Sequence, residues 1–225
     1  MPDSVEALYP FLYAGASDLD AVVAQVRQST RDKAAEIIAL REQVAEADGA
    51  RIEDCAHRMA VRFAAGARLF AFGNGGSSTD AQALSGLFVN PVGAAPPLPA
   101  FGLTSDIAVV TALSNDVGFD IVFARQLSAF GRSGDIAVGL STSGNSANLL
   151  RAFDECARRG MFTVGIAGYD GGKMAELESL DYLFVIPSTS VHRIQEAQTT
   201  LYHALWELTV RNLAALDDQS EGDQP

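Results

Sequence analysis

Five short apolar runs, separated by stretches of helical period, constrain the fold of this chain more than any other feature. Each run is nearly continuous in apolar residues, which is typical of strands buried on both faces. The runs span residues 68–72, 98–103, 135–141, 162–167 and 182–186. The helical segments between them span residues 79–89, 108–113, 119–130 and 145–159. This alternation predicts an α/β fold, a doubly wound five-stranded parallel sheet with helices on both faces and a ligand at the carboxyl ends of the strands.

The two ends of the chain show helical patterns without strands. Residues 18–47 and 51–65 predict two helices ahead of the first strand, and residues 190–216 predict one long helix after the last. We therefore expect three parts. They are a helical amino-terminal extension (1–50), a sheet domain (51–216) and a disordered acidic tail (217–225).

Composition excludes several classes of partner. The net charge of −12 repels nucleic acid and acidic membrane surfaces, so an anionic ligand has to be held by local donors. No run reaches the roughly 18 apolar residues of a membrane-spanning helix, and no signal-peptide pattern is present. Cys55 and Cys156 lack metal-ligand spacing and are interpreted as reduced packing residues. These features predict a cytoplasmic protein without direct nucleic-acid or membrane partners.

The third apolar run ends in six consecutive small polar residues, Ser141 to Ser146, directly before a helix that begins near Ala147. Hydroxyls and backbone N–H groups that converge at a helix start form a compact cradle for a phosphate. An ordinary helix cap is the alternative, but it needs only one such residue. We interpret this loop as an anion site.

The first run ends in a glycine-rich loop, Gly73-Asn74-Gly75-Gly76-Ser77-Ser78, which also precedes a helix. Its glycines allow backbone N–H groups to approach a ligand closely. The loop matches neither the Walker pattern nor the dinucleotide fingerprint. A plain tight turn remains an equal alternative.

Together the two loops resemble the sugar isomerase (SIS) domain, and residues 139–148 resemble its phosphoheptose isomerase branch. Residues 169–175 (Tyr-Asp-Gly-Gly-Lys-Met-Ala) and 193–196 (Arg-Ile-Gln-Glu) match the same branch in order and spacing. The resemblance covers residues 51–213. It implies a five-stranded SIS fold, a sugar phosphate as ligand, and a homotetramer with sites between subunits.

The resemblance also implies which residues contact the sugar phosphate. It assigns Gln195 to the carbonyl end. The residues assigned to the phosphate are Ser141, Thr142, Ser143 and Ser146. Those assigned to the sugar chain are Asn74, Gly75, Gly76, Asn115 and Asp116. From the residues alone, the Asn-Asp pair reads equally well as a turn.

The sequence departs from the family at the catalytic residues. Phosphoheptose isomerases use a glutamate and a histidine as acid–base pair, and these bind zinc with a second histidine and a glutamine. Here the glutamate and one histidine are replaced by Leu87 and Ala83, while Gln195 and His203 remain. Two ligands make a poor zinc site. We therefore expect neither stoichiometric zinc nor another cofactor, and we assign His203 as the remaining catalytic residue, with an interface histidine as the alternative.

Several residues are candidates to replace the missing acid–base residue. His192 stands where the family has an aspartate, and it is either a new acid or base or a surface histidine. Asp80, Asp116 and Glu196 are the candidate carboxylates.

Two functions stay open on this basis. The first is a ketose/aldose phosphate isomerase acting on a substrate like sedoheptulose 7-phosphate. The second is a catalytically inactive sugar-phosphate sensor or regulatory protein with an unidentified protein partner.

Overall fold

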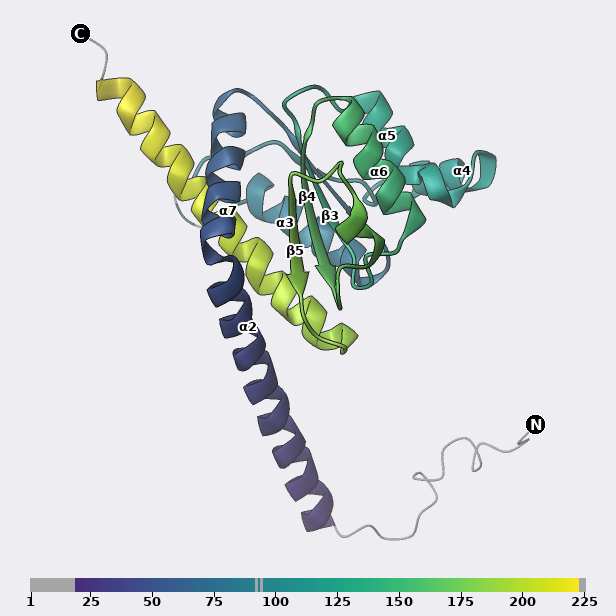
Figure 1. The fold of residues 1–225 in the computed structure, drawn as a ribbon, viewed down its shortest axis with the longest axis vertical. Helices are drawn as coiled ribbons and strands as arrows, with labels where there is room; N and C mark the ends of the chain where they lie inside the picture. The colour runs from purple at the N-terminus through teal and green to yellow at the C-terminus, as the bar shows by residue number, and fades with distance from the viewer. Residues whose placement is uncertain (1–18, 92, 94, 223–225) are drawn as a thin grey trace. The chain divides into compact units, whose positions relative to one another are not determined.

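The computed structural model describes residues 19–222, apart from residues 92 and 94. Its centre is a five-stranded parallel sheet with the order β2-β1-β3-β4-β5 (Figure 1). The strands are β1 (Leu69–Gly73), β2 (Ala100–Gly102), β3 (Ile136–Leu140), β4 (Phe162–Gly168) and β5 (Tyr182–Ile186). The predicted fold class is confirmed, and each strand starts and ends within two residues of its apolar run.

The three central strands are buried along their whole length, which explains why they read as unbroken apolar runs. Successive side chains of β1 point to opposite faces of the sheet. Phe70 and Phe72 join the core beneath α5 (Val122–Phe130) and α6 (Ala147–Arg158). The opposite face is covered by α3 (Gly76–Val89), α7 (Val191–Gly222) and the part of α2 (Leu19–Ala64) that follows residue 39 (Figure 1). Short elements complete the order: α4 (Ile107–Asp116), η2 (Phe119–Ile121) and η3 (Gly172–Glu176).

The helix predictions needed two corrections. The two helices predicted before the first strand are one helix, α2, because Gly49 lowers helix propensity by only about 1 kcal/mol and Val44 and Ile52 are buried on either side of it. At the other end α7 continues to Gly222, into the segment predicted to be a disordered tail; residues 223–225 lie outside the described residues.

Two compact units divide the chain, residues 1–39 and 40–225, so the break falls inside α2. The division into an extension at 1–50 and a sheet domain at 51–216 stays a prediction. All residues discussed below belong to the second unit. Among the described residues, no helix is both long and apolar enough to cross a membrane.

Both cysteine thiols are buried, and burial raises the pKa of Cys55 and of Cys156 to about 12. At pH 8 only about one such thiol in 10⁴ is ionised, and the thiolate is the reactive form. We expect the native protein to resist modification by Ellman's reagent at pH 8 and the urea-unfolded protein to release two equivalents of chromophore. Rapid labelling of the native protein would contradict the packing role.

Candidate functional site

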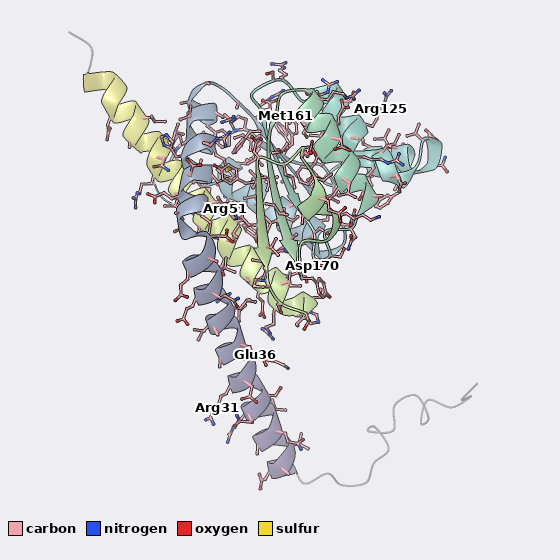
Figure 2. The ribbon with its side chains drawn as sticks, in the orientation of Figure 1. Arg31, Glu36, Arg51, Arg125, Met161 and Asp170 are labelled. Carbon is pink, nitrogen blue, oxygen red and sulfur yellow. The ribbon has the colours of Figure 1, made fainter. Side chains whose placement is uncertain are left out.

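The two loops selected from the sequence meet at one edge of the sheet. Gly73, the last residue of β1, pairs in register with Leu140, the last residue of β3, so both loops begin side by side. The loop after β4 leaves the sheet at the same edge. In Figure 2, Met161 and Asp170, which precede and follow β4, mark opposite ends of the sheet. The two loops therefore lie at the carboxyl ends of their strands, the end at which open α/β sheets bind ligands.

Hydrogen bonds within the loop from Ser141 to Ser146, here called the phosphate loop, hold its hydroxyls in place. The Gly144 N–H donates to Ser141 Oγ (3.0 Å), and the Asn145 N–H donates to Ser143 Oγ (3.3 Å). In both bonds the hydroxyl accepts, so its own proton remains able to donate to an anion. Ser146 starts α6 without a side-chain cap bond. The loop thus places several hydroxyl-bearing residues directly before the amino-terminal end of a helix.

Hydrogen bonds connect the phosphate loop to the end of β4 and to a third loop, which follows that strand. The Gly168 N–H donates to Thr142 O (3.0 Å), and the Met174 N–H donates to Gly144 O (3.0 Å). The Lys173 N–H donates to Asn145 Oδ1 (3.0 Å). Sequence reasoning noted this segment only as part of the resemblance, because contacts between distant loops leave no local signal.

The glycine loop is connected to the phosphate loop through a pair of amides. Asn74 and Asn148, the second residue of α6, exchange two hydrogen bonds of 2.9 Å each. Each amide keeps one N–H and a lone pair for other partners. On its other side the glycine loop meets α7, where a Cβ atom at Gly76 would lie 2.1 Å from Gln195 Nε2. Only glycine leaves room for this glutamine, which explains the small residue at that position.

A further residue that the sequence analysis missed is Gln198 on α7. Its side chain is fully buried, and Nε2 donates to Ser141 O (3.0 Å) and Ile166 O (3.3 Å), which holds the ends of β3 and β4 together. A sequence signal existed: Gln198 interrupts an apolar stripe at helical spacing that includes Ile194 and Leu201. A buried polar residue in such a stripe needs hydrogen-bond partners.

The remaining predicted residues lie apart from the phosphate loop. Asn115 and Asp116 form the exposed end of α4, where the Asn115 amide donates to Asp116 Oδ1 (2.9 Å), and in the described part of the chain neither bonds to either loop. His192 is exposed at the start of α7. His203 is half-buried, with ring centroids 5.3 Å from Tyr202 and 6.5 Å from Trp206.

The residues present do not fit a zinc ion. Ala83 and Leu87 offer only hydrocarbon, the Gln195 amide lies against Gly76, and the His203 ring packs beside Trp206. Within the described ranges, no group of three His, Cys, Asp or Glu side chains is placed to hold a metal.

A cavity of about 880 Å³ opens beside the phosphate loop. The residues that line it include Ser143, Asn145, Tyr169, Asp170 and Ser188. Hydroxyl, amide and carboxylate groups beside an aromatic ring suit a hydroxylated ligand such as a sugar.

The model of the SIS domain family matches residues 34–168 of this chain. The phosphoheptose isomerase of Nitratidesulfovibrio vulgaris (strain Miyazaki F) is 40% identical over 204 residues, which is 88% of this chain and 97% of the relative. That of Aquifex aeolicus is 41% identical over 159 residues, 70% of this chain and 82% of the relative.

Solved structures agree with the sequence comparison. A phosphoheptose isomerase from Neisseria gonorrhoeae superimposes with a TM-score of 0.75 at 34% identity, covering 82% of this chain and 98% of that one. A phosphoheptose isomerase from Francisella tularensis gives a TM-score of 0.74 at 29% identity, covering 87% and 100%. The chain belongs to the phosphoheptose isomerase family, which confirms the resemblance.

Proposed function

We propose that this protein isomerises a ketose phosphate to an aldose phosphate, with a substrate like sedoheptulose 7-phosphate. The observation that supports this most is the phosphate loop, whose hydroxyls stay free to donate at the start of α6. In a chain with a net charge of −12, such local donors are what an anionic substrate needs. The curated relatives named above carry the name of this activity.

The proposed contacts follow the sugar phosphate from one end to the other. Residues proposed for the phosphate are Ser141, Thr142, Ser143 and Ser146. Those proposed for the sugar chain are Asn74, Gly75, Gly76, Asn115 and Asp116. The amide pair at Asn74 and the close approach of Gln195 to Gly76 support a path from the phosphate loop towards α7. Gln195 is proposed at the carbonyl, and His203 as an acid–base group.

We also propose a cytoplasmic homotetramer. Exposed apolar side chains on the adjacent elements α4 and η2 support self-association, since monomers rarely expose large contiguous apolar patches. Ile107 on α4 is 68% exposed, Val117 between the two elements 53%, and Phe119 on η2 51%.

The activity is tested by incubating the purified protein with sedoheptulose 7-phosphate in D₂O and following the sugar by NMR. We expect deuterium to enter at C1 of the ketose and C2 of the aldose, with or without a zinc chelator. Ser141→Ala should weaken binding by roughly 10- to 100-fold, the effect of losing one hydrogen bond to a charged group.

Ser179→Ala is the matched control, because its hydroxyl donates to the exposed Asp154 (3.0 Å), away from the site. It should bind as the unmodified protein does. Saturable binding without any deuterium exchange would contradict the isomerase and favour a sugar-phosphate sensor.

A further inference from the structure

The replaced family residues lie on one face of α3, the helix that packs against α7. Gly76, Asp80, Ala83 and Leu87 follow one another at intervals of four, three and four residues, which places them in a single stripe. Gly76 lies directly against Gln195 of α7. The start of the stripe therefore borders α7, with which α3 is packed, while Ala83 further along is exposed.

The facing side of α7 carries polar groups at matching intervals. Thr199 and Tyr202 follow Gln195 by four and seven residues. The Thr199 hydroxyl donates to Gln195 O (2.9 Å). His203, next to Tyr202, stacks on its ring. We call this line of contact between the two helices the α3–α7 seam.

Asp80 is the only charged residue of α3, and it lies one turn beyond Gly76. It is partly buried, and in the part of the chain that the structure describes no hydrogen bond or ion pair reaches its carboxylate. Burial raises its pKa. The pKa of Tyr202 on α7 is raised as well, mainly by burial and further by the charge of Asp80.

The other candidate carboxylates are engaged elsewhere or exposed. Glu196 is exposed and forms an ion pair with Arg193. Asp116 is exposed at the end of α4 and accepts the Asn115 amide. A partly desolvated carboxylate without a cationic partner, next to a ligand site, is typical of a general base. Among the three, only Asp80 has this environment.

We propose that Asp80 is the general base of the isomerisation, in place of the glutamate that the family carries at Leu87. This inference rests on the function proposed above. Asp80 removes the proton from C1 of the ketose, and the electron pair of the broken C–H bond forms the C1=C2 bond of an enediol. The carbonyl oxygen on C2 takes a proton from His203. Asp80 then returns its proton to C2, the O1 hydroxyl gives its proton back to His203, and the aldose results without any further reactant.

The test compares Asp80→Asn with the unmodified protein on sedoheptulose 7-phosphate. We expect kcat and the rate of deuterium entry at C1 to fall by about 10²- to 10⁴-fold, the usual contribution of a general base. Substrate affinity should change less than threefold, because the phosphate loop is untouched. Glu178→Gln, the same chemical change at an exposed carboxylate, is the control and should keep full activity.

A second variant separates a catalytic from a structural role. Asp80→Asn with Ala83→Glu places a carboxylate one turn further along the same stripe, at an exposed position. The exchange rate of this double variant should be at least tenfold higher than that of Asp80→Asn alone. Thermal unfolding of both variants shows whether they fold.

The outcomes distinguish this inference from the function on which it rests. Deuterium exchange at the unmodified rate in folded Asp80→Asn would overturn the role of Asp80 and leave the isomerase in place. No exchange by the unmodified protein would overturn the isomerase and the role of Asp80 together.

Discussion

Gly144→Ala is expected to lower the affinity for a sugar phosphate by roughly 100-fold or more, about 2.7 kcal/mol. Gly144 adopts a φ of +66°, which costs other residues about 1–2 kcal/mol, and a Cβ atom there would lie 1.9 Å from Gly171 O. The hydrogen bonds from Met174 N–H to Gly144 O and from Lys173 N–H to Asn145 Oδ1 would have to open. The phosphate loop would then lose its present conformation.

Isothermal titration with sedoheptulose 7-phosphate measures this loss. Gly134→Ala is the matched control, because Gly134 has a similar left-handed backbone (φ +88°) but no atom within 4 Å of the added methyl group. It should lower stability slightly and leave binding unchanged. Unchanged affinity in Gly144→Ala would show that the phosphate is held elsewhere.

Asp135→Ala is expected to destabilise the fold by about 3 kcal/mol, at the lower end of the range for breaking a buried ion pair. The Asp135 side chain is only 4% exposed. Its carboxylate accepts the backbone N–H groups of Arg68 and Arg132 (2.9 Å each) and the Arg68 guanidinium (2.6 Å). Removing the carboxylate leaves these N–H donors, which lie beside the starts of β1 and β3, without their acceptor. The Arg68 side chain is 24% exposed, so water compensates part of the loss.

Urea unfolding at a fixed protein concentration measures this change. Asp120→Ala breaks an ion pair with Arg151 (3.6 Å) in which both side chains are more than half exposed. Such pairs contribute about 0–1 kcal/mol, so the unfolding midpoint should hardly move. Equal effects of the two substitutions would contradict the view that burial makes the Asp135 pair important.

Local patterns were sufficient for the sheet and for the phosphate loop. The strands β1, β3 and β4 are buried on both faces, and their sequences are apolar throughout for that reason. The polar residues from Ser141 to Ser146 follow one of these strands directly. Patterns failed where burial overrides propensity, as at Gly49, which lies inside α2 instead of ending a helix.

Other features depend on residues that are far apart in the chain. The third loop braces the phosphate loop, Asn148 pairs with Asn74, and Gln198 bonds to Ser141 O. The role of such a side chain depends on the residues that surround it in the fold, and a single sequence does not show these neighbours. The same holds for the carboxylic acids Asp80, Asp116 and Glu196. The sequence offers no reason to prefer one of them as a base, and the structure distinguishes them by burial and by their partners.

The phosphate loop was therefore predictable, because a strand end, small polar residues and a helix start are adjacent in the chain. Which carboxylate faces the seam between α3 and α7 was decided by tertiary structure alone. Packing brings Gly76 against Gln195 and leaves Asp80 partly buried, with no ion pair to any residue that the structure describes. The reactivity of a carboxylate depends on that environment.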